Sequence, residues 1–341
     1  MSTASPHISV REDWLSSRTE EVLDPDLSIV DAHHHLWDRP GERYLFAEYL
    51  ADVRSGHKVV ASIFAQCRSM YRETGPEEMR PVGEVEFVNG VAAQSASGIY
   101  GQFRACVAIV GFADLTLGAK VVPVLEAERR AGGDRLRGIR NTTAWHEDPV
   151  IRSNPKPPPP GLLSSDAFRQ GVRCLAREKL SLDVWAYHTQ LKEVIELARL
   201  NPDVSLILDH VGGPLGLGPY TGKRDAVFGD WKANIADLAA LPNVTVKLGG
   251  LGMKTTGFTF HEQPQPPGSR ELAEAWRPYI QTCIDLFGPD RCMFESNFPV
   301  DKGMFSYLIL WNAFKRIAAE FTAAEKRALF SGTATRVYRL S

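Results

Sequence analysis

Two hydrophobic patterns alternate along the chain. Short apolar runs rich in β-branched residues predict buried strands, and longer stretches with apolar residues every three or four positions predict amphipathic helices. The strands are expected at residues 28–37, 59–67, 103–111, 136–145, 180–187, 204–212, 244–252 and 292–300. The clearest helical stretches are residues 86–101, 120–133, 165–179, 190–201, 228–241 and 271–288.

Strands that alternate with helices in this way form parallel βα units. Eight such units predict an α/β protein with a single (β/α)8 TIM barrel. An open doubly wound sheet is the alternative, but no Gly-x-Gly-x-x-Gly motif follows the first strand. We therefore expect an N-terminal extension at residues 1–27 and one barrel domain at residues 28–341.

Composition narrows the range of partners. The 341 residues are 44% hydrophobic, and a net charge of −2 leaves no excess of basic residues for binding nucleic acid. No apolar stretch approaches the roughly 20 residues needed to cross a bilayer, and the N-terminus lacks a signal-peptide pattern. We expect a cytoplasmic protein that binds a small-molecule substrate and neither nucleic acid nor membrane. Association into homo-oligomers through outer helices is common for such barrels.

The five cysteines carry no functional argument. They are odd in number, scattered and without CxxC spacing, and most lie in apolar surroundings. We interpret them as reduced residues of the core.

Three long loops follow the ends of expected strands, at residues 153–163, 212–229 and 255–269. The carboxyl ends of the strands are the face at which barrel enzymes build their sites. These loops are therefore expected to surround a pocket.

The first strand contains the sequence DAHHHLWD at residues 31–38. Because side chains alternate across a strand, Asp31, His33 and His35 are expected on one side and Ala32 and His34 on the other. If the first side faces the barrel interior, two imidazoles share a small volume, at a spacing that suits a metal ion or a shared proton. His34 is then expected to face the helices and to be structural.

Other polar residues fall at the ends of later strands. His188 closes the fifth strand, His210 lies near the end of the sixth, and Arg140 ends the fourth. Arg140 would provide a planar fork for a carboxylate or a polarised carbonyl, or would pair with an acid of the barrel. In the eighth strand, Glu295 and Asn297 lie two residues apart and therefore on one face.

These residues and their surroundings resemble the amidohydrolase superfamily, in particular the amidohydrolase-related branch with sugar-acid lactonases and 2-pyrone-4,6-dicarboxylate lactonase. The matching segments are VDAHHHLWD, RGIRNTTAW, LDHVGGP, VKLGGLG and MFESNFPVD. In that superfamily, the HxH of strand one and the histidines of strands five and six surround the reaction centre. The resemblance therefore implies a metal or catalytic set of His33, His35, His188 and His210.

Two departures from the family pattern affect the chemistry. Members with two metals use a strand-four lysine or glutamate as a bridge, whereas this strand offers Arg140, so a two-metal centre is not expected. The family's strand-eight aspartate is replaced by Asn297, and an amide cannot accept a proton at neutral pH. Glu295 is then the nearest candidate base; alternatively a histidine deprotonates the water, or hydrolysis has been lost.

The leading hypothesis is hydrolysis of a sugar-acid or carboxylated lactone by activated water. His33 and His35 would polarise the carbonyl or bind a metal, His188 and His210 would bind it or transfer protons, and Arg140 would bind an acidic substrate group. Related lactonases exist without metal, so whether this protein binds one zinc ion remains open. No organic cofactor is expected. A metal-dependent decarboxylase of the same branch and a non-hydrolytic barrel that binds sugar acids are the alternatives.

Overall fold

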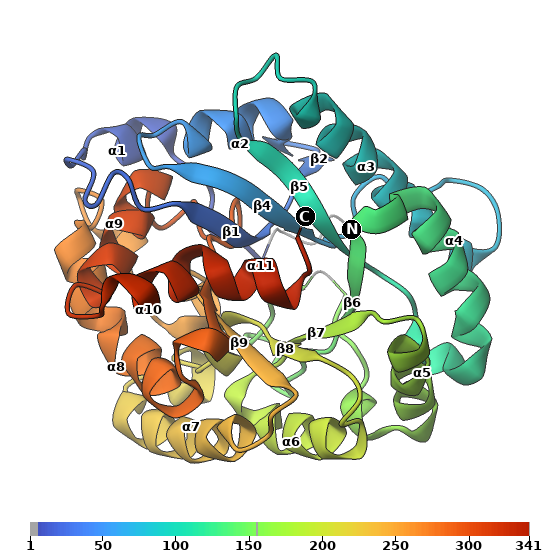
Figure 1. The fold of residues 1–341 in the computed structure, drawn as a ribbon. Helices are drawn as coiled ribbons and strands as arrows, with labels where there is room; N and C mark the ends of the chain where they lie inside the picture. The colour runs from blue at the N-terminus through green and yellow to red at the C-terminus, as the bar shows by residue number, and fades with distance from the viewer. Residues whose placement is uncertain (1–5, 155, 341) are drawn as a thin grey trace.

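The computed structural model describes residues 6–154 and 156–340. Eight parallel strands follow one another around a barrel in chain order (Figure 1). They are β1 (Ile29–His34), β4 (Val59–Ala65), β5 (Arg104–Gly111), β6 (Leu136–Thr142), β7 (Ser181–Trp185), β8 (Leu206–Leu208), β9 (Val244–Leu248) and β10 (Cys292–Phe294). The predicted TIM barrel is confirmed.

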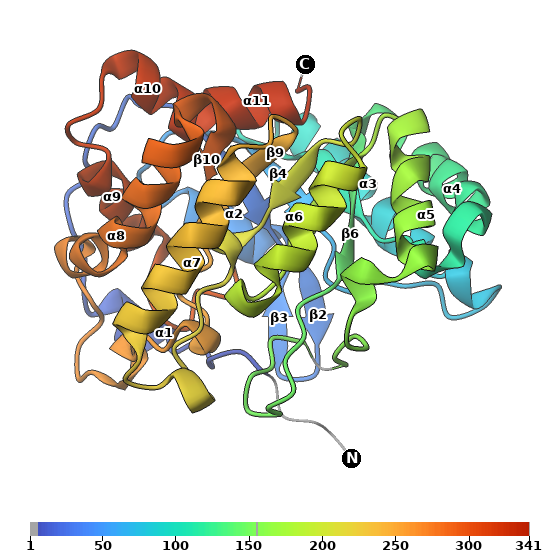
Figure 2. The ribbon, with the colours of Figure 1, turned by 90° about the horizontal axis from the view of Figure 1, so that it is seen from below.

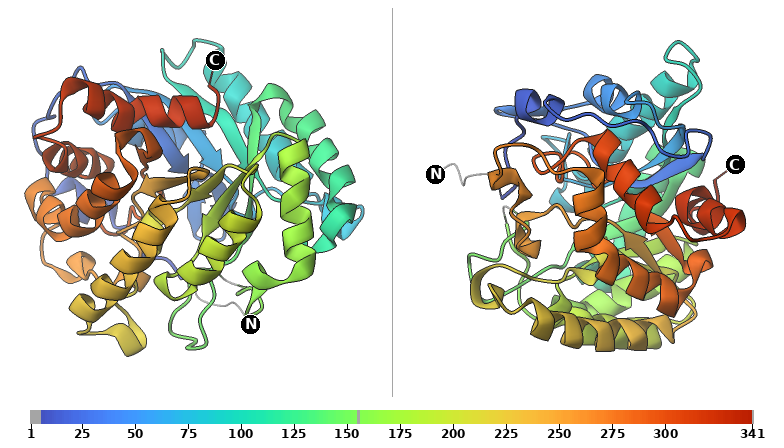
Figure 3. Two further views of the ribbon diagram at one scale, coloured as in Figure 1. Left: turned by 60° about the horizontal axis from the view of Figure 1, so that its bottom comes forward. Right: turned by 90° about the vertical axis from the view of Figure 1, so that its left-hand side faces the viewer.

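Helices cover the outside of the barrel (Figure 3). The longer ones are α2 (Phe46–Val53), α3 (Val82–Ala96), α4 (Val122–Gly132), α5 (Asp166–Arg177), α6 (Leu191–Leu200), α7 (Arg224–Ala239), α8 (Ser269–Phe287) and α9 (Tyr307–Ile317). Short helices are α1 (Glu12–Ser16), α10 (Ala323–Arg327) and α11 (Thr333–Val337). An antiparallel hairpin that the sequence did not predict, β2 (Trp37–Arg39) and β3 (Glu42–Tyr44), extends from the end of β1.

Backbone hydrogen bonds join the last strand segment to the first. The amide of Asn297 donates to the carbonyl of His33 over 2.9 Å, and the amide of His35 donates to the carbonyl of Phe298 over 2.8 Å. These bonds lie just beyond the end of β10, at the carboxyl ends of the strands. Ring closure therefore takes place where the candidate site residues lie.

The two ends of the barrel differ. The amino-terminal half of the interior holds a small apolar cluster that includes Val30, Ala32, Met293 and Tyr338. Tyr338 directly follows α11, which lies at the opposite end of the molecule from the β2–β3 hairpin (Figure 2). One end of the barrel thus holds this apolar cluster, and the polar groups of the candidate site lie toward the other end.

The expected alternation in the first strand is wrong at Asp31. Its carboxylate accepts hydrogen bonds from Tyr49 of α2 and Tyr307 of α9, at 2.9 and 3.0 Å, so it faces the helices. Ala32 belongs to the interior cluster instead. The pairing register with β4 shifts between Asp31 and His34, and this irregularity turns His33 inward after Ala32.

His34 faces the helices, as predicted. Its ring stacks on Tyr49 with 4.0 Å between centroids, and its Nε2 lies 3.0 Å from Oγ of Ser62. Burial lowers the pKa of His34 to about 3, so the ring is neutral. Its role is structural.

Several strands end earlier than predicted because the backbone turns at the site. The sixth ends at Leu208 and the eighth at Phe294, whereas we expected them to continue to residues 212 and 300. His210, Val211 and Asn297 have φ angles of 56°, 49° and 55°, a left-handed conformation outside the region of regular β-strand. His210 and Asn297 therefore project from turns, whereas His33 and Arg140 lie within β1 and β6.

Three further expectations concern the cysteines, membrane spans and the start of the barrel domain. All five cysteines are unpaired, and four are buried, whereas Cys67 is half-buried. Across the described residues, no helix combines the length and apolar composition that crossing a bilayer requires. The boundary between extension and barrel at residue 27 stays a prediction.

Candidate active site

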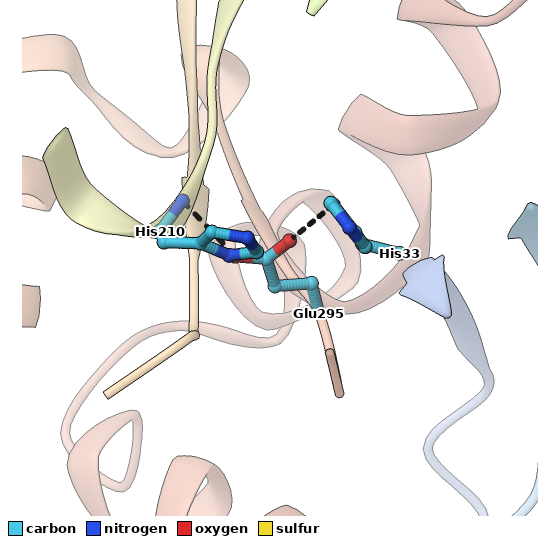
Figure 4. Close-up of side chains that lie close together, drawn as sticks. All are labelled: His33, His210 and Glu295. Carbon is cyan, nitrogen blue, oxygen red and sulfur yellow. Dashed lines mark hydrogen bonds and ion pairs between the residues drawn. The ribbon is translucent and has the colours of Figure 1, made fainter. Parts of the chain in front are cut away.

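Three polar side chains meet where three strands of the barrel end: His33 in β1, His210 just after β8 and Glu295 just after β10 (Figure 4). Oε1 of Glu295 lies 2.7 Å from Nδ1 of His210, and its Oε2 lies 3.0 Å from Nδ1 of His33. All three residues are buried. The structure thus brings together residues 33, 210 and 295, which are far apart in the sequence.

Two consecutive glycines make room for this contact. A Cβ on Gly249 would lie 2.4 Å from Cγ of Glu295, and one on Gly250 would lie 2.4 Å from Cβ of His210. Gly250 also has a φ of 67°, which favours glycine. The GG of the VKLGGLG segment therefore permits the close approach of Glu295 and His210.

Glu295 remains a carboxylate. Burial by itself raises the pKa of Glu295, but the imidazoles of His210 and His33 outweigh it and lower the value to about 2. A carboxylate can only accept hydrogen bonds, so Nδ1 of His210 carries the proton of the 2.7 Å contact. In a neutral imidazole with its proton on Nδ1, Nε2 carries the lone pair.

His33 lies between two cationic side chains. Nη1 of Arg140 is 3.1 Å from its Nε2, and Nζ of Lys247 is 3.2 Å from its Nδ1. Burial lowers the pKa of His33, and the charge of Lys247 lowers it further. The ring is therefore neutral, the form that binds a metal ion or accepts a hydrogen bond.

His35 lies beside His33, with 3.2 Å between their Nε2 atoms. Its Nδ1 is 2.8 Å from the carbonyl oxygen of Ala65, an acceptor, so Nδ1 carries the proton and Nε2 is unprotonated. Burial holds the pKa of His35 well below its usual value, and the neighbouring His33 adds to this effect.

The donor set suits a zinc ion. His33 and His35 present Nε2 atoms at close range, and neutral imidazoles are common zinc ligands. His33, His210 and Glu295 also offer ligand atoms that all lie within 4.8 Å of one another. The guanidinium of Arg140, beside Nε2 of His33, opposes a cation at that position.

His188 lies apart from this cluster. Its ring packs edge-on against Tyr220 at 5.1 Å between centroids, and its Nδ1 accepts a hydrogen bond from the amide of Leu215 over 3.3 Å. Burial lowers the pKa of His188 to about 4. The described contacts connect His188 to loop residues, not to His33 or His210, so its site role stays a prediction.

Asn297 is held in one orientation by Asp301. Its Nδ2 donates to Oδ1 of Asp301 over 2.9 Å, and Oδ2 of Asp301 accepts the amide of Gly252 over 3.0 Å. The Oδ1 of Asn297 is buried and has no hydrogen-bond partner among the described residues. Asn297 therefore presents an unpaired acceptor at the site, where the family pattern has a carboxylate.

A cavity of about 250 Å³ opens over these groups. Its wall includes His35, Arg140, Trp185, His210 and Asn297. Glu295 and His33 lie beneath the wall and do not line the cavity. The group that can reach a bound molecule is thus His210, with Glu295 behind it.

The N-terminal segment also reaches this cavity. His7 lines it, and its ring stacks on Trp37 of β2 with 5.8 Å between centroids. Residues before the barrel therefore contribute to the wall of the site.

Comparison with known proteins identifies the family. The Amidohydrolase (Amidohydro_2) family model matches residues 30–340, nearly the whole chain. The chain belongs to this amidohydrolase family. The resemblance predicted from the sequence motifs is confirmed.

Relatives of this amidohydrolase include lactonases. It is 32% identical to an uncharacterized protein, y4mH, of Sinorhizobium fredii (strain NBRC 101917 / NGR234), over 92% of this chain and 99% of that one. It is 29% identical to an L-fucono-1,5-lactonase of Burkholderia multivorans, over 91% of this chain and 96% of that one. A solved amidohydrolase from Burkholderia multivorans with bound zinc has a TM-score of 0.68 at 27% identity, covering 92% of this chain and 99% of that one.

Sequence reasoning missed a cluster of buried charged residues next to His33. Lys247 of β9 contacts Asp183 of β7 at 2.7 Å and Asp209 at 3.1 Å, and Tyr338 donates to Asp183 over 2.6 Å. All four side chains are buried. A lysine or aspartate inside an apolar strand, as in VTVKLGG and LSLDVWAY, was the available signal.

Asp301 was also missed as a partner of Asn297. It lies four residues further along the chain, beyond the predicted strand. Only the turn after Phe294 brings the two side chains together, so strand periodicity could not indicate the contact.

Proposed function

We propose that this amidohydrolase hydrolyses the ester bond of a sugar-acid lactone, with His210 as general base. The observation that supports this proposal most directly is the 2.7 Å contact between Oε1 of Glu295 and Nδ1 of His210, together with the position of His210 in the cavity wall. A base that faces the substrate and is oriented by a buried carboxylate is the arrangement used to activate water.

The proposed reaction moves one proton through His210. Nε2 of His210 takes a proton from water as the water oxygen bonds to the lactone carbonyl carbon. When the ring carbon–oxygen bond breaks, the same proton passes to the departing alkoxide, and the product is a hydroxy acid. Glu295 stabilises the imidazolium formed between these steps because its pKa of about 2 keeps it negatively charged.

The negative charge that develops on the carbonyl oxygen requires a donor. Arg140 lines the cavity and is anchored by Asp209, with 3.3 Å between Nη1 and Oδ2. A fixed guanidinium in a buried site stabilises an oxyanion without reorganisation. We therefore assign Arg140 to the carbonyl rather than to a peripheral acidic group.

A zinc ion is part of this proposal. His33 and His35 would hold it, and bound zinc would supply a Lewis acid for the carbonyl and a lower pKa for the attacking water. Support comes from the donor set of this chain and from the zinc in the Burkholderia multivorans relative.

The curated relatives favour a sugar-acid lactone as substrate. One relative, which matches 91% of this chain, is an L-fucono-1,5-lactonase. The replacement of the family's strand-eight carboxylate by Asn297 argues against the decarboxylase alternative, which relies on that carboxylate as a metal ligand.

The test is a hydrolysis screen across 1,4- and 1,5-lactones of sugar acids and across aromatic-catabolism lactones, followed as acid release at constant pH. We expect turnover of at least one lactone that disappears in His210→Ala. The same protein is incubated with hydroxybenzoates while carbon dioxide is measured. Carbon dioxide release without lactone hydrolysis would replace this proposal with decarboxylation, and the absence of both would leave the barrel as a binding protein.

A further inference from the structure

The charged residues of the cavity wall all have one sign. Three arginines, Arg39, Arg68 and Arg140, line it, and the described residues contribute no aspartate or glutamate to the same wall. Cavities lined by one sign of charge concentrate ligands of the opposite sign. The protein as a whole has a net charge of −2, so this concentration of positive charge is a property of the site.

Arg39 is fixed in place without a carboxylate partner. Its guanidinium stacks over the ring of Trp37 at 4.2 Å, and Nη2 donates to the carbonyl of Cys67 over 2.6 Å. Within the described part of the chain it forms no ion pair. A half-buried guanidinium without a counter-ion has lost part of its hydration. Charge-assisted hydrogen bonds to a bound anion would compensate for this loss.

Arg68 lies in the loop after β4 and is also free of acidic partners among the residues described. Its Nη2 donates to Oγ1 of Thr142, at the end of β6, over 3.0 Å. The backbone of Arg68 has a φ of 63°, so the residue adopts a left-handed conformation that bulky side chains rarely take. The turn directs this side chain to the cavity wall.

Arg140 differs from these two. It pairs with Asp209 and contacts His33 at the base of the cavity, where the reacting carbonyl is expected. Its charge is already partly neutralised. The two arginines without ion pairs are thus available for a different part of the same molecule.

We propose that Arg39 and Arg68 bind a carboxylate carried by the lactone, so that the substrate is the lactone of a sugar diacid rather than of a simple aldonic acid. The inference rests on the proposed function, which it makes more specific. A guanidinium binds a carboxylate in a planar, charge-assisted geometry, which a hydroxymethyl group does not match. A cavity of about 250 Å³ suits a single sugar ring.

The test compares matched substrates that differ at one carbon. Aldaro-1,4-lactones carry a carboxylate where the aldono-1,4-lactones of the same configuration carry a hydroxymethyl group. With gluco, galacto and manno pairs, we expect wild type to favour the charged member by about 10- to 100-fold in kcat/KM, the range of a charge-assisted bond. Arg39→Ala and Arg68→Ala should lower this preference mainly by raising KM, and Arg39→Lys should restore only part of it.

Arg173→Ala, an exposed arginine of α5, is the matched control and should leave both substrates unaffected. Added salt should raise KM for the charged lactones more than for the neutral ones. Equal or better use of the neutral lactones by wild type, or a preference that survives in the Arg39→Ala/Arg68→Ala variant, would overturn the inference and leave lactone hydrolysis intact.

A binding measurement separates this failure from failure of the proposed function. Calorimetric titration with galactarate and galactonate does not require turnover. We expect galactarate to bind more tightly to wild type and to lose that advantage in the double variant. Binding that shows this pattern in a protein without lactonase activity would keep the anion site and reject the reaction; equal binding of the two acids would reject the anion site.

Discussion

One carboxylate oxygen of Glu295 holds both the side chain and the backbone of His210. Oε1 accepts from Nδ1 over 2.7 Å and from the His210 amide over 3.2 Å. The hydrogen bond from the backbone amide fixes the left-handed turn from which the imidazole projects. The hydrogen bond from Nδ1 fixes the position of the proton on the ring. Position and proton state of the proposed base thus depend on a single buried group.

Replacing Glu295 with glutamine should therefore impair turnover far more than substrate binding. We expect kcat for lactone hydrolysis to fall by about 10²- to 10⁴-fold with little change in KM, because the amide cannot stabilise the imidazolium. The double variant with His210→Ala should be no slower than the slower single variant, since the two residues act as a unit. Glu86→Gln, a surface carboxylate paired with Arg72, is the control. Additive losses would contradict the dyad.

Gly250→Ala tests whether the close approach of the backbone positions His210. The new Cβ would lie 2.4 Å from Cβ and Cγ of His210, so we expect the ring to shift and kcat to fall at least tenfold. Gly288→Ala is the matched control, since Gly288 has a similar φ of 77° but no atom within 4 Å of the added methyl. It should cost about 1–2 kcal/mol of stability through backbone strain alone, with kinetics unchanged. Equal kinetic effects of the two substitutions would refute this role of Gly250.

Zinc content should depend on His33 and His35. We expect wild-type protein purified without chelator to contain zinc, and His33→Ala and His35→Ala to lose it, as measured by atomic emission and competitive chelator titration. His188→Ala should retain zinc because its described contacts are with Tyr220 and Leu215. Full lactonase activity after complete zinc removal would show that Arg140 and the imidazoles suffice without a metal.

The stability of the fold should decrease as the pH rises above 4.5 because of Glu128, a buried residue of α4. Burial raises the pKa of Glu128 well above the ordinary glutamate value of 4.5, and the neighbouring Glu84 carboxyl raises it further. The folded protein then retains a proton that the unfolded chain releases above pH 4.5, so stability is lost as pH rises through the folded pKa.

Glu128→Gln should remove this dependence, because the amide is neutral at every pH. We expect the variant to match wild type near pH 4 and to have a higher melting temperature at pH 8, by about 1 kcal/mol or more in unfolding free energy. Glu126→Gln, on the exposed side of the same helix, should show no such gain. A variant that is less stable than wild type at pH 8 would show that Glu128 is ionised in the folded protein.

The sequence alone determined the number of strands in the barrel and the kind of fold. Alternating apolar runs and amphipathic stretches are local properties, and a barrel of eight βα units follows from their count and order. The motifs around His33, His210 and Glu295 likewise indicated the family, because each is a short contiguous segment.

Only the tertiary structure decided which of these polar groups meet. The register shift after Asp31 reversed the expected face of that residue, and the turn at Asn297 gave it Asp301 as a partner. Strand periodicity assumes a regular backbone, so it fails where left-handed residues end the strands. Arg39 and Arg68 lie on the same cavity wall because β1 and β4 are neighbours in the barrel, so that the hairpin after β1 lies beside the loop after β4.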